Sequence, residues 1–290
     1  MNNTDKNILI SAIVPIYKGN KYIEEIVHMY ERNVQNTKLA ESEYVELIFV
    51  NDYPEEKLTR CQTLCPRLLI RYMETRKNYG IHGARIRGIH FANGKYIHML
   101  DQDDRIEDNY LASQLLHIDG MPAVVCNGIN KSRYTSSSIY NRTDYPIKKC
   151  NDLRGIIIAG SPFVSPGQVL IEKNAISDYW RTHRMKKNGY DDLLLWILFL
   201  SSGKKFATNE EIIYYHSYNG KNVSANNLGM GLSSLEMVEH LKRAHCLSPY
   251  GRSLLRRRMI YKQKKVLMKR PELAELLVLD INILKAVWGY

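Results

Sequence analysis

Three carboxylates stand within four positions of the chain, at Asp101, Asp103 and Asp104, with Gln102 between the first two. Like charges packed this closely repel one another, so they require solvent or a cation. Mg²⁺ and Mn²⁺ take one or two protein carboxylates and leave their other positions to water and substrate phosphates. The spacing therefore suits a divalent-metal site. It also suits a solvated acidic loop that caps the next helix, and the local sequence leaves both interpretations open.

A short apolar stretch, YIHML at residues 96–100, leads directly into these carboxylates and predicts a buried strand. A continuous apolar run rich in β-branched residues predicts a strand at 9–17, and further runs predict strands at 44–50 and 68–73. The spacing of apolar residues predicts helices over about 22–33, 55–65 and 81–91, with Cys61 and Cys65 packed on one helix face. This alternation predicts an α/β fold with a mostly parallel sheet flanked by helices.

In parallel sheets, ligands bind beyond the carboxyl ends of the strands. Three of the predicted strands end at that edge, in Pro15-Ile16-Tyr17, in Asn51-Asp52 and in the acidic stretch 101–104. Polar and acidic groups thus converge on one crevice. This convergence favours the metal site over the simple helix cap.

Four segments together resemble the nucleotide-sugar half of family 2 glycosyltransferases, which have the Rossmann-like GT-A fold. They are IVPIY at 13–17, IFVND at 48–52, NYGIHGAR at 78–85 and GKYIHMLDQDD at 94–104. The resemblance implies an inverting hexosyl- or N-acetylhexosaminyl-transferase, a nucleoside-diphosphate sugar donor (usually a UDP-sugar), and Mn²⁺ or Mg²⁺. It implies that Asp103 ligates the metal that bridges the diphosphate, and that Asp101 faces the ribose side and is a further candidate ligand. The nucleotide-binding residues that it implies are Pro15, Tyr17, Asp52, Asn78, Arg85, Asp101, Gln102 and Asp103.

The resemblance continues more thinly in the second half of the chain. Residues 165–171 are similar to a turn and strand that border the donor sugar, and residues 189–196 to an acidic pair ahead of a Leu-Trp helix. Alignment on Trp196 puts Asp192 at the position of the general base, which accepts the proton of the acceptor hydroxyl, and Asp191 at its acidic neighbour. Simple capping of that helix is the alternative.

Residues 212–224 resemble a loop that closes over the nucleotide, and they contain His216. The resemblance makes His216 a candidate third metal ligand or a diphosphate contact. A packed or surface histidine is the plainer alternative.

The net charge of +11 is concentrated in one segment. Residues 242–270 hold eleven Lys or Arg and no Asp or Glu, which leaves the remainder of the chain balanced. Within it, residues 252–270 predict a basic amphipathic helix, which suits an anionic membrane surface. A solvated or interdomain helix is the alternative. Nucleic acid is not expected as a partner, because no aromatic interleaving or nucleic-acid motif accompanies the basic residues.

The expected organisation is a GT-A domain over 1–232, with a nucleotide-sugar half of about 1–105 and an acceptor half of about 106–232, followed by a basic helical extension over 233–290. The apolar spacing in 271–290 predicts packing on the body or pairing with a second copy. The five scattered cysteines, the polar start without a signal peptide and a longest apolar run of eight residues predict a cytoplasmic protein, peripheral at the inner face of the plasma membrane.

The resemblance and the basic segment together indicate transfer to a glycan or lipid-linked acceptor, in bacterial surface polysaccharide synthesis of the capsule, O-antigen or teichoic acid type. Two other classes remain open. A sugar nucleotidyltransferase would share the sheet and metal but needs a glycine-rich basic loop after the first strand, of which residues 15–20 are a poor version. A non-catalytic nucleotide-sugar or polyanion-binding protein would keep residues 101–104 but would not need Asp191 and Asp192.

Overall fold

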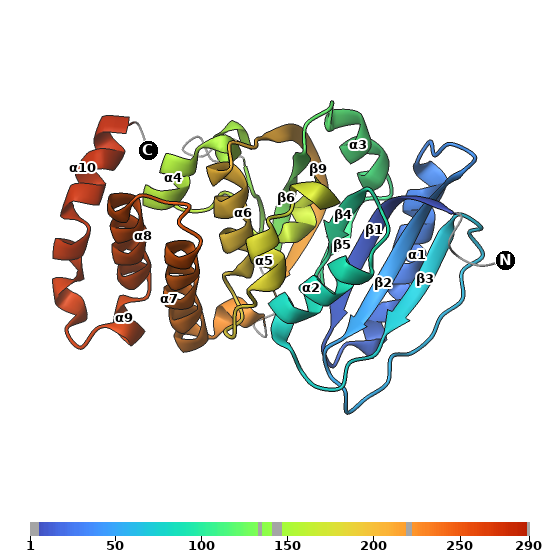
Figure 1. Cartoon of the computed structure of the whole chain (residues 1–290), viewed down its shortest axis with the longest axis horizontal. Coiled ribbons are helices and arrows are strands. Elements are labelled where there is room, and N and C mark those ends of the chain that lie inside the picture. Colours follow the sequence, from blue (N-terminus) through green and yellow to red (C-terminus); the bar gives the residue numbers. More distant parts are fainter. Residues whose placement is uncertain (1–5, 133–134, 141–146, 219–221, 289–290) are drawn as a thin grey trace. The chain divides into compact units, whose positions relative to one another are not determined.

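The computed structural model describes residues 6–132, 135–140, 147–218 and 222–288 (Figure 1). The chain forms two compact units that alternate along the sequence. We call them the sheet unit (Met1–Ile139, Ser165–Ile176 and Phe206–Ser217) and the helical unit (Tyr140–Val164, Ser177–Lys205 and Tyr218–Tyr290). The domain boundary expected between residues 232 and 233 stays a prediction.

The sheet unit is built on a nine-stranded sheet in the order β3-β2-β1-β4-β8-β6-β9-β5, with β7 paired to β6 off this path. The β3-β2-β1-β4 half is parallel, and β8 then runs antiparallel to both β4 and β6. The sheet is therefore mixed, and the predicted α/β class with flanking helices is confirmed. The strands are β1 (Asn7–Ile16), β2 (Glu43–Asn51), β3 (Leu68–Met73), β4 (Tyr96–Met99), β5 (Arg105–Ile106), β6 (Ala123–Ser132), β7 (Ser136–Ser138), β8 (Val169–Glu172) and β9 (Phe206–Tyr218).

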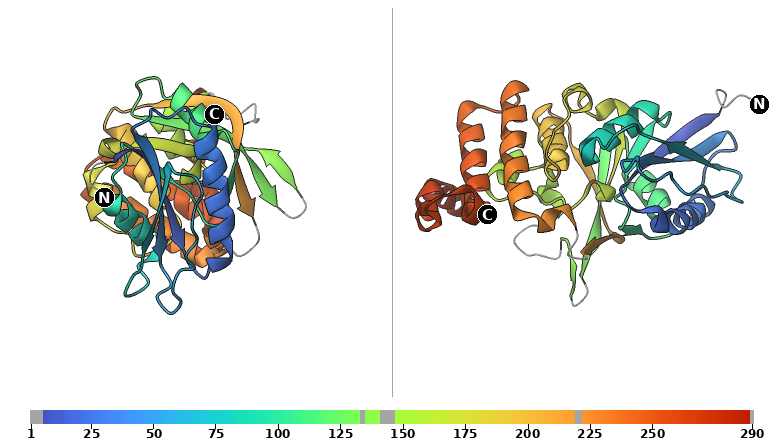
Figure 2. Two further views of the ribbon diagram at one scale, coloured as in Figure 1. Left: turned by 90° about the vertical axis from the view of Figure 1, so that its right-hand side faces the viewer. Right: turned by 90° about the horizontal axis from the view of Figure 1, so that it is seen from below.

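Two helices cover opposite faces of the parallel half (Figure 2). Successive residues of a strand point to opposite faces, so β1 supplies both contacts. Ala12 and Val14 belong to one buried cluster with residues of α1 (Ile23–Asn36). Ile13 points the other way, towards α2 (Gly80–Phe91), where a Cβ on Gly88 would lie 2.4 Å from its Cγ2. Burial on both faces explains why β1 reads as a continuous apolar run.

The predicted helix over 55–65 is wrong, and with it the packing of two cysteines on a helix face. These residues, all within the described part of the chain, form an extended loop between β2 and β3. Side chains of neighbouring elements, and not a helical ladder, bond its backbone: Asn20 Nδ2 donates to the Lys57 carbonyl (2.9 Å), Glu74 Oε1 accepts from Leu58 N (3.1 Å), and Tyr72 Oη accepts from Cys61 N (2.7 Å). A buried backbone group needs a partner, and side chains provide it here.

The helical unit packs around α6 (Asp191–Ser201), whose residues 193–200 are all buried. The predicted basic helix over 252–270 is divided, because α8 ends at Lys262 and a separate short α9 follows. Pro249 begins α8, and Ser248 Oγ caps it by accepting from Gly251 N at 3.1 Å. The other helices of the unit are α4 (Leu153–Ile158), α5 (Asp178–Thr182), α7 (Asn227–Arg243), α9 (Lys264–Leu267), the 3₁₀ segment η7 (Pro271–Leu277) and α10 (Leu279–Trp288).

Within the described parts of the chain, we find no helix that is both long and apolar enough to cross a lipid bilayer.

Candidate active site

The acidic stretch 101–104 forms the turn between β4 and β5 in the sheet unit. Leu100 N donates to the Ile13 carbonyl at 3.0 Å, which continues the pairing of β4 with β1 up to the turn. Asp104 N then donates to the Asp101 carbonyl at 3.1 Å and closes the turn. The turn thus lies at the carboxyl edge of the parallel strands, where the sequence predicted it.

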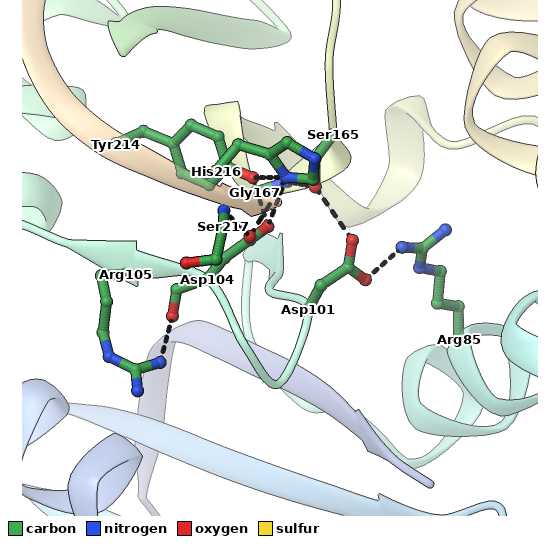
Figure 3. Close-up of polar contacts among 9 residues, drawn as sticks. All are labelled: Arg85, Asp101, Asp104, Arg105, Ser165, Gly167, Tyr214, His216 and Ser217. Carbon is green, nitrogen blue, oxygen red and sulfur yellow. Dashed lines mark hydrogen bonds and ion pairs between the residues drawn. The ribbon is translucent and has the colours of Figure 1, made fainter. Parts of the chain in front are cut away.

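Asp104 is completely buried and is held by three groups of β9 (Figure 3). Tyr214 Oη donates to its Oδ2, Ser217 N donates to its Oδ1 at 2.9 Å, and His216 Nδ1 lies 3.1 Å from Oδ1. Burial alone would lower the pKa of His216, but the hydrogen bond to Asp104 and the carboxylate charges of the turn raise it. Asp104 therefore fixes the orientation of the imidazole ring.

Asp101 is bonded on both oxygens (Figure 3). Arg85 Nη2, on α2, lies 2.5 Å from Oδ1, and Ser165 Oγ donates to Oδ2 at 3.1 Å. Arg85 is buried, so this ion pair is only partly open to solvent. Ser165 also begins the 3₁₀ turn η4 (Pro166–Gln168), where its Oγ accepts from Gly167 N at 3.2 Å. Asp101 thereby joins the turn to α2 and to the segment ahead of β8.

Gln102 fastens the turn to the end of β1. Tyr17 N donates to its Oε1 at 2.9 Å, and its Nε2 donates to the Tyr17 carbonyl at 3.1 Å. The Tyr17 ring is half exposed and meets Tyr53 edge-to-face, with ring centroids 5.4 Å apart. At the end of β2, Asp52 accepts from Tyr79 N at 2.6 Å. An exposed aromatic surface therefore lies beside the acidic turn.

Asp103 is partly buried. Burial, followed by the charges of Asp104 and Asp101, raises its pKa above the ordinary range, while its own backbone hydrogen bond and His216 oppose the shift. An added cation would relieve this repulsion. Among the described residues, no group of three or more His, Cys, Asp or Glu is arranged to hold a metal ion. Asp103 with so few neighbouring ligands suits a metal that takes most of its ligands from water and phosphate oxygens.

Asp191 and Asp192 begin α6 in the helical unit, as the sequence predicted. Asp191 is buried, and its carbonyl accepts from Trp180 Nε1 at 2.7 Å. Asp192 is partly exposed, and its Oδ1 accepts from Leu193 N at 2.6 Å. The acidic pair belongs to a different unit from the turn 101–104.

The sequence did not identify three members of the site. These are Asp104, which was treated only as part of an acidic run, its distant partner Tyr214, and Ser165, the distant partner of Asp101. His216 was expected in a loop, but it lies on β9. Residues 219–221 of that expected loop lie outside the described residues. The one available signal was the apolar run IIYY at 212–215, which is typical of a strand.

A buried histidine, His98, helps to hold the segment 165–168 in place. His98 Nδ1 lies 2.7 Å from Tyr30 Oη, and its Nε2 lies 3.0 Å from the Gly167 carbonyl. Burial lowers the pKa of His98 to about 4, so the ring is neutral at pH 7. The neutral tautomer that satisfies both contacts donates from Nε2 to Gly167 and accepts from Tyr30 at Nδ1. Tyr110 Oη donates to the same carbonyl at 2.8 Å, so two buried side chains fix the position of the segment 165–168.

We expect His98 to make stability depend on pH. In the unfolded chain its pKa returns to about 6.5, whereas in the folded protein it is about 4. Between these values the unfolded state binds the proton and the folded state does not, so stability falls as the pH falls from about 6.5 to about 4. The difference between the two pKa values corresponds to about 3 kcal/mol in the free energy of unfolding. Urea unfolding of the wild type and of His98→Gln at several pH values measures it. The variant should be less stable at pH 7 and should show a smaller loss on acidification; equal slopes would contradict this role.

The family profile described as "Glycosyl transferase family 2" matches residues 11–180, more than half of the chain. The chain belongs to glycosyltransferase family 2. The matched range contains the turn 101–104, Arg85 and Ser165. The predicted family and enzyme class are thereby confirmed.

Curated relatives of this family 2 glycosyltransferase match it over part of their length. The minor teichoic acid biosynthesis protein GgaB of Bacillus subtilis is 28% identical over 124 residues, which cover 41% of this chain and 13% of GgaB. The glycosyltransferase GlyG of Streptococcus pneumoniae is 28% identical over 126 residues, 41% of this chain and 38% of GlyG. The matched region is thus well under half of either relative.

Solved structures show the same fold. Residues 1–349 of Staphylococcus aureus TarS, in complex with UDP-GlcNAc, align with a TM-score of 0.54 and 17% identity over 93% of this chain and 86% of that one. The mannosyltransferase PcManGT of Pyrobaculum calidifontis, in complex with GDP-Man and Mn²⁺, aligns with a TM-score of 0.52 and 15% identity over 97% of this chain and 76% of that one. The predicted GT-A fold is confirmed.

Proposed function

We propose that this family 2 glycosyltransferase transfers a sugar, with inversion and with the help of Mn²⁺ or Mg²⁺, from a nucleoside-diphosphate sugar to a glycan or lipid-linked acceptor. The observation that carries the proposal is the turn 101–104 at the carboxyl edge of the parallel strands. Its Asp103 is a partly exposed carboxylate with a raised pKa. The neighbouring Asp101 and Gln102 bond the turn to α2 and to the end of β1. Ligands of parallel sheets bind at this edge.

The donor's nucleotide is proposed to lie against the ends of β1 and β2. The half-exposed Tyr17 ring offers an aromatic surface for a base, and Asp52 and Asn78 lie on the loops beside it. Arg85, paired with Asp101, brings positive charge towards the diphosphate. Support comes from the two solved structures, one with UDP-GlcNAc and the other with GDP-Man. A UDP-sugar is our expected donor.

Asp103 is proposed as the main metal ligand, with Asp101 and His216 as the further candidates. Both oxygens of Asp101 already accept hydrogen bonds, so Asp101 contributes chiefly by holding Arg85 and the turn in place. His216 directs Nδ1 to Asp104, which leaves Nε2 as the nitrogen for a metal or a diphosphate oxygen. A bound Mn²⁺ or Mg²⁺ would supply neutralisation of the charge that develops on the leaving diphosphate.

Asp192 is proposed as the general base that accepts the proton of the attacking acceptor hydroxyl. Its partial exposure suits this role better than the burial of Asp191 does. The acceptor is proposed to be a growing surface polysaccharide of the teichoic acid type, since one relative is named for minor teichoic acid biosynthesis. The concentrated positive charge of 242–270 would attract the enzyme to the anionic cytoplasmic face of a membrane, which supports a lipid-linked acceptor. Membership of the glycosyltransferase family disfavours the two alternative classes.

A thermal-shift screen of nucleotide sugars with and without Mn²⁺ tests this proposal. A donor at a hundred times its dissociation constant adds roughly 2.7 kcal/mol of stability, which is about 5 °C or more in melting temperature. We expect one nucleotide-sugar group, the UDP-sugars, to stabilise the protein only when Mn²⁺ or Mg²⁺ is present. Stabilisation by none of them, with either metal, would contradict the proposal.

A further inference from the structure

The segment η7–α10 is the last part of the helical unit along the chain, and α10 lies at one end of that unit (Figure 1). This segment exposes apolar side chains. Of the sixteen large apolar side chains that the described part of the chain exposes, six lie within 22 residues of one another. They are Val266, Leu273, Leu276, Leu279, Ile283 and Val287, with exposed fractions from 39% to 72%. Scattered exposed apolar residues are ordinary, but a cluster of this kind marks an interaction surface.

Helix geometry shows that the exposed residues of α10 form a continuous face. Leu279, Ile283 and Val287 follow one another at four-residue spacing, so they lie along one side of α10. Ile281 points the opposite way and is 1% exposed, so that side of α10 is the packed one. Asp280 borders this side of α10 next to Val287 and its side chain is 45% exposed, but its charge is paired with Arg257. The helix therefore presents to solvent the kind of face that helices normally bury.

The neighbouring positive charge is only partly neutralised. Arg257 forms two hydrogen bonds with Asp280, at 2.8 and 2.9 Å, and Lys264 lies 3.2 Å from Glu275. These pairs tie α8 and α9 to η7 and α10 and engage two of the three acidic residues there; the third, Glu272, is exposed. Exposed cations remain just before η7: Lys265, Lys269 and Arg270. They immediately precede the exposed Leu273 and Leu276 along the chain.

We propose that the outward face of η7 and α10, together with Lys265, Lys269 and Arg270, docks onto an anionic lipid bilayer. Apolar side chains can enter the boundary between headgroups and acyl chains, while the cations meet the phosphates. Pairing with a second copy is disfavoured, because both copies would bring the unbalanced charge of the 242–270 segment to the contact. The inference rests on the proposed function, since it names the surface at which a lipid-linked acceptor would be met.

Co-sedimentation with vesicles of phosphatidylcholine, alone or with one third phosphatidylglycerol, tests the proposal. The full chain should bind the anionic vesicles at low salt, leave them at high salt and ignore the neutral ones. The triple variant Leu279→Gln, Ile283→Gln, Val287→Gln should lower the partition coefficient at least tenfold. The variant Lys265→Gln, Lys269→Gln, Arg270→Gln should lower it by a similar factor. All six side chains lie on the surface, so the fold should survive.

Control variants make similar changes in the surface of other parts of the chain. Leu64→Gln with Leu116→Gln removes two exposed leucines of the sheet unit, and Lys38→Gln, Lys57→Gln, Lys205→Gln removes three exposed lysines. Both control variants should bind as the wild type does. Equal loss in the controls, equal binding to neutral vesicles, or no vesicle binding would overturn the proposal. So would a dimer, seen by analytical ultracentrifugation, that the α10 variant abolishes without any vesicle binding. Donor-induced thermal shifts in the same variants report separately on the proposed function.

Discussion

Replacing Asp192 by Asn is expected to lower kcat for sugar transfer by about 10²–10⁴-fold, the usual effect of losing a general base. Asn has nearly the same shape and can still accept a hydrogen bond from Leu193 N, so the first turn of α6 should persist. Donor binding depends on the sheet unit and should stay nearly unchanged. Steady-state kinetics with a saturating donor, combined with a thermal shift by the donor, separates the two effects.

Asp191→Asn is the matched control for this prediction, because it makes the same change one residue earlier. Asp191 is buried at the start of α6, whereas Asp192 is partly exposed. We expect Asp191→Asn to affect stability more than kcat. If Asp191→Asn shows the large loss in kcat and Asp192→Asn does not, the base is Asp191 and the assignment is off by one residue.

Asp103→Asn is expected to abolish transfer and to weaken Mn²⁺-dependent donor binding by more than about 100-fold, since even outer partners of metal ligands contribute 10- to 100-fold. The metal-free variant should be at least as stable as the wild type. The pKa of Asp103 is raised, so its ionised form disfavours the folded state at neutral pH, and Asn removes that charge. Calorimetric titration with the donor and Mn²⁺, together with urea unfolding, measures both quantities.

The control for Asp103→Asn is Asp119→Asn, which removes an exposed carboxylate of the same unit. Asp119 has a positive φ of 40°, a conformation that Asn also adopts readily. This control should bind the donor normally. An Asp103→Asn variant that keeps the Mn²⁺ dependence of the wild type would exclude Asp103 as the principal ligand.

The parallel half of the sheet unit could be predicted from sequence because its signals are local. The run 68–73 coincides with β3, and the predicted helix over 81–91 differs from α2 by one residue. The acidic turn could also be placed, since it follows the apolar run of β4 directly. Each of these elements carries its own periodicity and its own boundary residues.

The remaining features depend on contacts between distant residues. Tyr214 bonds Asp104 across 110 positions of the chain, and Ser165 bonds Asp101 across 64. No local sequence pattern predicts either hydrogen bond. The loop 55–65 has apolar spacing that suggests a helix, but side-chain partners such as Glu74 hold it extended. The outward apolar face of α10 likewise emerges only from packing, because the same leucines and valines could equally have been buried. Tertiary contacts decided each of these cases.

The most direct measurement is proton NMR of the anomeric signal during turnover. A UDP-sugar carries an α linkage, so inverting transfer to water or to an acceptor hydroxyl yields a β product. With the donor found in the thermal-shift screen and Mn²⁺, we predict that the β anomer appears first, that chelation of the metal stops its formation, and that Asp192→Asn slows it. Initial release of the α anomer, or turnover unaffected by chelation, would contradict a metal-dependent inverting transferase.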